Sequence, residues 1–387
     1  MEEPGRSECL ETRKTRIVCI SDTHCQTPKL PRGDVLIHAG DLTNQGSYSE
    51  LKKTVDWLEK AEFEAKIVVA GNHDITLDPS FYEEHGSLWR WPQTQDPEAC
   101  RQLLTASPSI TYLENEAANI YLRAPGGPHT CFKVYGSPYS PKSHRWAFQY
   151  EAERAKKLWD GIPSDTDIVV THTPPKGHCD QATKDDRSGC ETLLGALYRV
   201  RPMLSICGHI HEARGVERMR WNDSGAEDGG VVEEVEKWKD PGIGNKQSLV
   251  NLTAAGGRSL DNGSRLTRQA VVLQQNRGLT LQDCDGGGQP GVPGSHGPMV
   301  FRRTQRPAYA GSSHSEAEEE RATKNGLESA ADHDQREDDD DCKSRRETAV
   351  INAAVLGPRL AGKGMQFNKP IVVDVALPVW SFENNVG

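Results

Sequence analysis

The sequence predicts an α/β fold that gathers polar side chains along one edge of a parallel β-sheet. Short runs of β-branched residues alternate with an amphipathic segment at the spacing of a strand-helix-strand unit. Aspartate, asparagine or histidine follows the end of five apolar runs in this 387-residue chain. Parallel strands place their carboxyl ends at the same edge of a sheet, where ligands of open α/β sheets collect. We therefore expect a functional site at that edge.

The first two apolar runs both end in candidate metal ligands. The first strand is expected over Arg16–Ile20, and Asp22 and His24 come directly after it. Side chains two residues apart in an extended chain share one side, so these two are able to bind one metal ion together. The second run, 34–39, ends in Gly40-Asp41, where the glycine permits a sharp turn beneath a metal.

A helix and a third strand complete the unit. Ser47 is expected to cap the helix, in which apolar residues recur near a period of 3.6: Leu51, Val55, Leu58 and Phe63. The strand over 66–70 then runs into Gly71-Asn72-His73-Asp74. Strands joined through a helix in this way are parallel, so this motif is expected beside the first two.

The middle of the chain supplies two further motifs of the same kind. Residues 78–106 are expected to form a loop with short helices that walls a cleft. Strands are expected over 111–113, 118–122, 131–135, 167–170 and 203–207, and helices over 151–159 and 193–200. The strand over 167–170 ends in Thr171-His172, and the strand over 203–207 leads into Gly208-His209-Ile210-His211.

The composition changes after Trp221. Residues 223–346 are rich in Gly, Ser, Asp, Glu and Gln, a composition that buries too little apolar surface to offset its ordering entropy. We expect a largely disordered, low-complexity insertion there, with one strand over 247–252. Strands return over 348–355 and 371–375. One domain, formed by 14–222 and 347–387 around the insertion, is the simplest interpretation.

Charge and cysteine usage restrict the class of partner and the compartment. The net charge is −10, and 313–341 alone holds twelve acidic and three basic residues. No strongly basic surface is expected, which disfavours a nucleic-acid partner. The ten cysteines include no C-x-x-C pair, which excludes the usual structural zinc site. The amino terminus lacks the apolar core of a signal peptide, and no apolar run is long enough to span a membrane. A cytoplasmic protein with free thiols is expected, the nucleus being the alternative.

The candidate ligands indicate a pair of divalent metal ions. Seven side chains recur at strand ends: Asp22, His24, Asp41, Asn72, His172, His209 and His211. Carboxylates, an amide and imidazoles suit manganese, iron or zinc better than calcium or magnesium. Seven ligands are too many for one such ion and sufficient for two, provided that Asp41 bridges them. His73 is left over, and we expect it to protonate a leaving oxygen while Asp74 orients it.

Together these motifs resemble the calcineurin-like metallophosphoesterase superfamily over residues 16–220 and the last strands. The resemblance implies a four-layer αββα sandwich of two mixed sheets flanked by helices. It also implies one metal held by Asp22, His24, Asp41 and His211, and a second held by Asp41, Asn72, His172 and His209. His73 matches the catalytic acid of that superfamily.

A narrower resemblance concerns the metallophosphoesterase-domain proteins, a group near the class III cyclic nucleotide phosphodiesterases. It rests on three stretches: 21–24, 171–178 and Asn352-Ala353-Ala354 with 368–374. Some members of this group carry glycine in place of the first histidine of the last motif and lose most of their activity. This chain keeps His209, which favours an active enzyme.

The expected function is hydrolysis of a phosphodiester, with a cyclic nucleotide as one candidate, by attack of a hydroxide that bridges two metal ions. Manganese is the favoured metal, with iron, zinc or magnesium as alternatives. The alternative functions are a phosphomonoesterase or protein phosphatase, a nuclease, and a catalytically idle metal-binding module. The expected partner is a small phosphoester and not a membrane, and the acidic segment is a candidate docking site for a protein.

Overall fold

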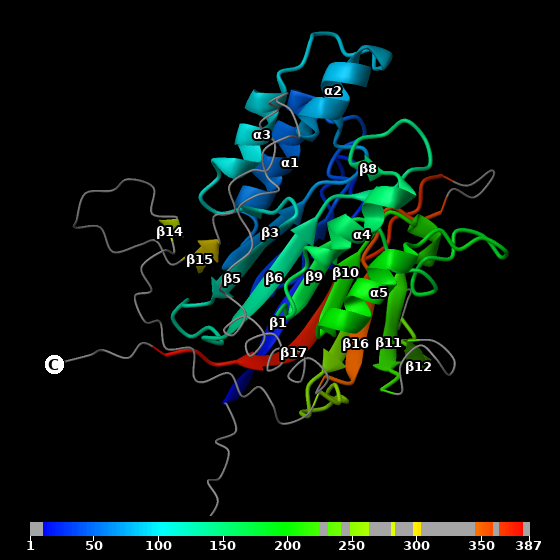
Figure 1. The fold of residues 1–387 in the computed structure, drawn as a ribbon. Coiled ribbons are helices and arrows are strands. Elements are labelled where there is room, and N and C mark those ends of the chain that lie inside the picture. The colour runs from blue at the N-terminus through cyan, green and yellow to red at the C-terminus, as the bar shows by residue number, and fades with distance from the viewer. Residues whose placement is uncertain are drawn as a thin grey trace, which may run out of the picture.

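Two mixed β-sheets lie face to face at the centre of the molecule, and helices cover the outer face of each sheet (Figure 1). This computed structural model describes residues 11–223, 231–240, 248–262, 280–282, 297–302, 345–358 and 364–381. The four-layer αββα sandwich implied by the sequence resemblance is therefore confirmed.

The first sheet contains six strands in the order β13-β17-β1-β2-β3-β4. Their bounds are β1 (Thr12–Ile20), β2 (Val35–Ala39), β3 (Ala65–Val69), β4 (Thr111–Tyr112), β13 (Ser248–Leu252) and β17 (Ile371–Pro378). Strands β1, β2 and β3 are parallel, and β17 is antiparallel to β1. The predicted strand-helix-strand unit is β2, α1 (Tyr48–Lys60) and β3, and it places the ends of these strands at one edge.

The second sheet contains nine strands in the order β12-β11-β16-β10-β9-β6-β5-β15-β14. Their bounds are β5 (Glu116–Tyr121), β6 (Cys131–Ser137), β9 (Ile168–Thr171), β10 (Leu204–Cys207), β11 (Gly215–Trp221), β12 (Val232–Lys237), β14 (Thr280–Gln282), β15 (Met299–Arg302) and β16 (Glu347–Asn352). Strand β10 is parallel to both β9 and β16, so the ends of β9 and β10 also share an edge. A two-stranded pair, β7 (Ser140–Pro141) and β8 (Gln149–Tyr150), lies outside the two sheets.

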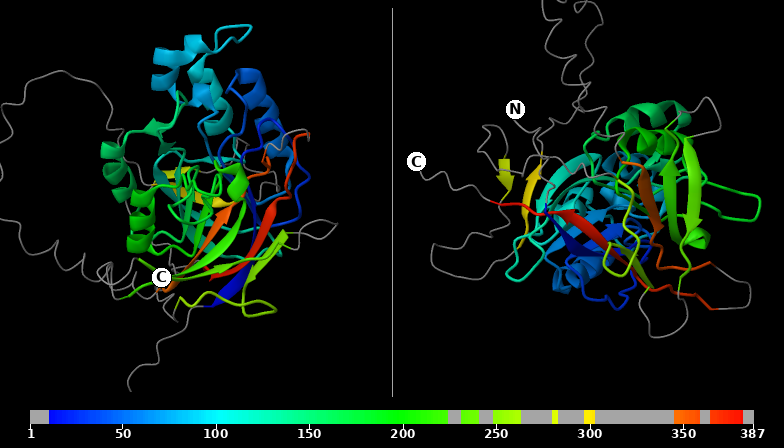
Figure 2. Two further views of the ribbon diagram at one scale, coloured as in Figure 1. Left: turned by 90° about the vertical axis from the view of Figure 1, so that its right-hand side faces the viewer. Right: turned by 90° about the horizontal axis from the view of Figure 1, so that it is seen from below.

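Apolar side chains on both faces of the central strands hold the four layers together. Along β1, Ile17 points into the core between the sheets, whereas Val18 points outward to the first helical layer. Strands buried on both faces carry continuous apolar runs, which is why they were recognisable in the sequence. Figure 2 shows the strands between the blue and cyan helices on one side and the green helices on the other.

Each helical layer packs on one sheet through a buried stripe. The helices besides α1 are α2 (Pro79–His85), α3 (Pro97–Thr105), α4 (Ala152–Asp160) and α5 (Glu191–Val200), with short 3-10 turns η1 (Ile75–Leu77), η2 (Gly86–Leu88) and η3 (His211–Ala213). Helices α1 and α3 pack on the first sheet, and α4 and α5 on the second. Ser47 caps α1 as predicted, in a capping box with Glu50. Among the described residues, no helix is long and apolar enough to cross a membrane.

Part of the expected insertion belongs to the sheets. The strand predicted over 247–252 is β13, which pairs with β17. The expectation of low-complexity chain does not hold for β12 and β15. Strand β12 is an edge strand with little apolar surface, and its Lys237 lies opposite Glu217 of β11, so ladder hydrogen bonds and charge pairs replace a hydrophobic run. Strand β15 buries Phe301 beside β5. The acidic run Asp338–Asp341 lies outside the described residues.

We expect Asp374→Asn to lower the free energy of unfolding by about 2 kcal/mol. Arg16 of β1 donates from Nε and Nη2 to the two carboxylate oxygens of Asp374 on β17, each at 2.7 Å. The Asp374 side chain is only 4% exposed and that of Arg16 is 30% exposed, so the amide would leave part of a half-buried guanidinium unpaired. Urea unfolding measures the loss. The control is Asp56→Asn, which removes an exposed pair with Lys52 and should change stability by less than about 0.5 kcal/mol; equal losses in both variants would contradict the prediction.

Candidate metal centre

The loops that follow β1, β2 and β10 bring four predicted ligands into one cluster. Asp22, His24, Asp41 and His211 each offer one ligand atom, and these atoms all lie within 4.8 Å of one another. Three of the four residues are buried, and His211 is partly exposed at the start of η3. This is the set that the sequence resemblance assigns to the first metal.

The other three predicted ligands lie beside this cluster. His172, at the end of β9, places its Nε2 atom 3.0 Å from Asn72 Oδ1. The ring of His209 lies 4.9 Å from the ring of His172, measured between centroids. The backbone N–H of His209 donates to both carboxylate oxygens of Asp22, at 3.1 and 3.0 Å, which ties the two groups together.

Asp41 lies between the two groups. Its Oδ2 atom is 3.6 Å from Nε2 of His24, and its Oδ1 atom is 3.4 Å from Nε2 of His172. One oxygen therefore faces the first group and the other oxygen faces the second. Asp41 is thus the carboxylate that contacts both groups.

The ring nitrogens of two histidines fit a divalent metal ion. Nδ1 of His24 donates to the carbonyl of Thr43 at 3.1 Å, and Nδ1 of His172 donates to the carbonyl of Ala39 at 2.9 Å. Nε2 is then the ring nitrogen left to bind a metal, after loss of a proton in the case of His172. Nε2 of His24 is buried and has no hydrogen-bond partner among the described residues. A buried nitrogen of this kind is costly to leave unpaired, and a cation would satisfy it.

Four of the seven predicted ligands have left-handed backbone conformations. The φ angles are 52° at Asp22, 44° at His24, 52° at Asp41 and 68° at His209. Such conformations are unfavourable for residues other than glycine, and they cluster at functional sites. Four of the ten described non-glycine residues with a positive φ are thus predicted ligands.

Glycines allow the motifs to approach one another closely. A Cβ atom added to Gly208 would lie 2.1 Å from Oδ2 of Asp22, and one added to Gly71 would lie 2.3 Å from Oδ1 of Asp41. Both distances are far below van der Waals contact, so any side chain at these positions would displace a carboxylate. These glycines are therefore part of the site.

The electrostatics of the cluster suit cation binding. Burial raises the pKa of Asp22, but the hydrogen bond and charge of His211 outweigh it and lower the pKa to about 2. Burial lowers the pKa of His209 to about 4. Ionised carboxylates and neutral imidazoles are the forms that bind metals. At His172, burial is outweighed by the charge of Asp41, which raises the pKa to about 9, so a metal would displace a proton there.

His73 lies at the edge of the cluster with one ring nitrogen available. Its backbone N–H donates to Oδ1 of Asp41 at 2.8 Å, and its Nδ1 atom donates to the carbonyl of Asn44 at 2.8 Å. Its ring meets the ring of His24 edge-on, with 4.8 Å between centroids. The remaining nitrogen, Nε2, is the atom that is able to reach a substrate.

Asp74 does not orient His73 as expected. Its carboxylate accepts hydrogen bonds from the backbone N–H groups of Leu42, Thr43 and Gly71, at 3.1, 3.0 and 2.8 Å. It therefore joins the loops after β2 and β3 beneath the centre, and burial raises its pKa to about 7. The carbonyl of Asn44 orients His73 instead. Every residue has a backbone carbonyl, whatever its side chain, so the sequence could not reveal this partner.

Asn352, at the end of β16, holds the loop that carries His209 and His211. Its Nδ2 atom donates to the carbonyls of Ile210 at 2.9 Å, Cys179 at 3.1 Å and Gly208 at 3.4 Å. Its side chain is fully buried. In the sequence, Asn352 was noted only as part of a family resemblance. Its three hydrogen bonds show that it stabilises the loop after β10.

Three other histidines are not among the predicted ligands. His38 is buried, contacts Thr23 Oγ1 at 2.9 Å, and has its pKa lowered to about 4 by burial. His178 pairs with Glu217, with 3.1 Å between Nδ1 and Oε2. His144 is exposed on a loop.

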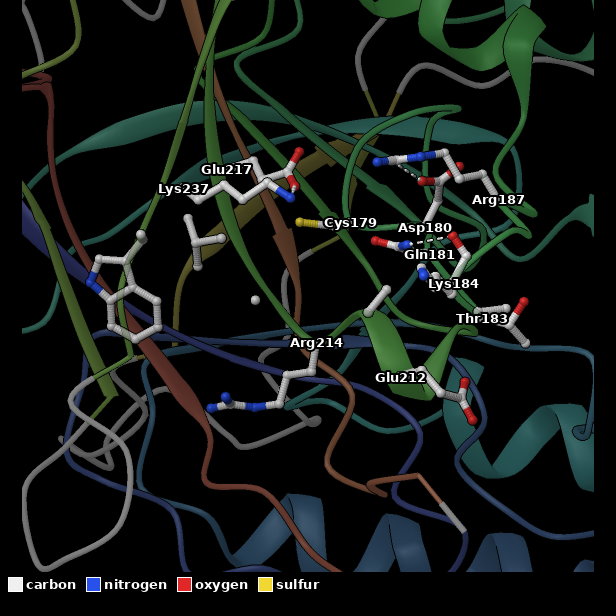
Figure 3. A pocket seen from close by; sticks show the side chains of 15 residues that line it. Cys179, Asp180, Gln181, Thr183, Lys184, Arg187, Glu212, Arg214, Glu217 and Lys237 are labelled. Carbon is white, nitrogen blue, oxygen red and sulfur yellow. Dashed lines mark hydrogen bonds and ion pairs between the residues drawn. The ribbon is translucent and has the colours of Figure 1, made fainter. Parts of the chain in front are cut away.

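A cavity of about 360 Å³ lies beside η3 and β11, and Glu212, directly after His211 in the chain, is one of its lining residues, whereas none of the predicted ligands lines it (Figure 3). Residues 179–184 form another part of the wall. Its charges are largely paired: Asp180 binds Arg187 at 3.0 Å, and Lys237 lies 3.4 Å from Glu217. The cavity is thus a polar hollow without a large excess of one charge.

The αββα sandwich with carboxylates and imidazoles gathered at the strand ends defines a metal-dependent enzyme of the phosphoesterase class. A profile of the calcineurin-like phosphoesterase family matches residues 15–213, which include every predicted site residue. The chain belongs to the calcineurin-like phosphoesterase family.

Known proteins share this region with the chain. Metallophosphoesterase domain-containing protein 1 of Homo sapiens is 38% identical over 211 residues, covering 52% of this chain and 62% of the relative. A probable rhamnogalacturonate lyase C of Emericella nidulans is 42% identical over 209 residues, covering 54% of this chain and 18% of the relative. The chain thus spans less than two thirds of the length of either relative. The crystal structure of TT1561 of Thermus thermophilus is 14% identical with a TM-score of 0.31, over 51% of this chain and 82% of that one.

Proposed function

We propose that this chain is a dimetal-dependent phosphoesterase that hydrolyses a phosphodiester. The observation that carries the proposal is the position of Asp41, whose two oxygens face two separate groups of ligands. The first group is Asp22, His24 and His211, and the second is Asn72, His172 and His209. Two divalent ions bound there would activate a water molecule and neutralise the charge of the phosphate. Two manganese ions are the favoured metal pair for these mixed oxygen and nitrogen ligands.

The residues of the chain have separate tasks in this proposal. The ionised carboxylate of Asp41 fixes both ligand groups and also holds the backbone of His73. Because Nδ1 of His73 is bound to a carbonyl, Nε2 is the nitrogen that delivers a proton to the leaving oxygen. Asn352 and Asp74 keep the loops around these side chains in place.

The preference for a diester follows the sequence resemblance to the group near the class III cyclic nucleotide phosphodiesterases. A small phosphodiester, with cyclic nucleotides as the first class to test, is therefore the proposed substrate. An intracellular location and a protein partner for the acidic run stay predictions from the sequence.

We expect metal-stripped protein to be inactive and Mn²⁺ to restore cleavage of bis(p-nitrophenyl) phosphate over p-nitrophenyl phosphate. Metal content is measured on the same samples, with His144→Ala as a control for purification and handling. Preference for the monoester would replace the proposal with a phosphomonoesterase. No turnover of either ester by protein that holds two metals per chain would replace it with an idle metal-binding module.

A further inference from the structure

The indole of Trp146 lies over the face of the His73 ring. The two ring centroids are 4.0 Å apart, and the ring planes are inclined by 32°. His24 contacts the same imidazole edge-on, at an angle of 87°. The carbonyl of Asn44 accepts from Nδ1. The His73 ring therefore has three contacts: Trp146 on its face, His24 edge-on, and the carbonyl of Asn44 at Nδ1.

The loop that carries Trp146 is anchored on the same motif as His73. The backbone N–H of Ala147 donates to the carbonyl of Asn72 at 3.2 Å, and the N–H of Phe148 donates to the carboxylate of Asp78 at 2.9 Å. Ala147 and Phe148 are buried, and Phe148 has a left-handed backbone with a φ of 51°. A strained, buried anchor next to a half-exposed tryptophan indicates that its position is imposed by the fold.

A second tryptophan also contacts Trp146. The ring of Trp89, just after η2, lies 6.0 Å from the ring of Trp146 between centroids, and a further 6.1 Å separates Trp89 from Trp91. These contacts give Trp89 and Trp91 a packing role. The packed indoles limit the space into which Trp146 is able to move.

We infer that Trp146 is a positioning residue that fixes the imidazole plane of His73 for proton donation to the leaving group. The inference rests on the proposed function. The χ2 torsion of histidine is broad, and a ring without this wall would rotate away from the carbonyl of Asn44. Rotation would turn Nε2 away from the substrate, and small misplacement of an acid is costly in rate.

The test compares leaving groups that differ in their need for a proton. The substrates are aryl methyl phosphates whose leaving group ranges from p-nitrophenyl to phenyl. The rate of hydrolysis is measured for four proteins loaded with Mn²⁺: wild type, His73→Ala, Trp146→Leu and Trp146→Phe. A good leaving group departs without help, whereas phenoxide needs the acid. We expect Trp146→Leu to lose about tenfold more kcat on the phenyl ester than on the p-nitrophenyl ester. Trp146→Phe should restore most of this difference, and Trp57→Leu on α1 should behave as wild type.

A second readout uses metal-free protein and needs no turnover. An indole face 4.0 Å from an imidazole shifts the ring protons of His73 upfield in the NMR spectrum, and this shift should vanish in Trp146→Leu. The His73→Ala spectrum assigns the signal. An unchanged shift would overturn the contact itself.

The kinetic outcomes separate the inference from the function on which it rests. If wild type hydrolyses the series and kcat of Trp146→Leu depends on the leaving group as it does in wild type, the inference alone is overturned. A uniform rise in KM across the series would also overturn it, because it would show that Trp146 only binds aryl groups. Wild type without activity on any member would overturn both.

Discussion

Asp41→Asn is expected to lower phosphodiester hydrolysis by about 10³-fold and to reduce the metal content of the protein. The carboxylate faces His24 with one oxygen and His172 with the other, and the amide offers only one oxygen and no charge. Bound metals contribute several kcal/mol to catalysis of this type, and each 1.4 kcal/mol corresponds to about a tenfold change in rate. The loss should therefore exceed that of any single outer ligand.

The measurements for Asp41→Asn are turnover, metals per chain and the melting temperature of the metal-free protein. Asparagine keeps an oxygen that accepts from the N–H of His73, so the fold should persist. The matched control is Asp56→Asn, the same chemical change at an exposed position of α1. Full activity with two metals per chain in Asp41→Asn would show that this carboxylate does not bridge.

His73→Ala is expected to lower kcat by about 10²–10⁴-fold with little change in metal content. The ring lies beside the cluster, and its Nδ1 atom is bound to the carbonyl of Asn44, so removing it takes away a proton donor but no predicted ligand. Metals per chain and kcat on a phenyl ester are measured together. The matched control is His144→Ala on an exposed loop. A parallel fall in metal content and activity would instead make His73 a ligand.

The sequence predicted the grouping of the ligands because it depends on strand ends, whereas the sandwich was implied by the family resemblance. Apolar runs such as β1 and β10 are buried on two faces and stand out from their surroundings. Once the parallel order of β1, β2 and β3 is known, Asp22 and Asp41 must lie at one edge. The spacing of residues along the chain is enough for this inference.

The contacts within the site were beyond sequence analysis. The role of Asp74 was predicted wrongly, because a neighbour in sequence need not be a neighbour in space. The left-handed backbone at Asp22 and the contact of Trp146 with His73 depend on how loops from distant segments pack. Strand β12 was not predicted because an edge strand needs few apolar residues and so lacks the hydrophobic run by which the other strands were identified.

Strands β16 and β17 carry none of the predicted ligands, yet each occupies an interior place in its sheet. The last residue of β17, Pro378, lies 167 positions after His211 in the chain. At about 5–20 residues per second of synthesis, a ribosome adds this stretch in roughly 10–30 s. At the start of this stretch every predicted ligand has been made, but neither sheet is complete and Asn352 has not yet been added. The two sheets that position the predicted ligands are therefore completed by strands that are synthesised after all of these ligands.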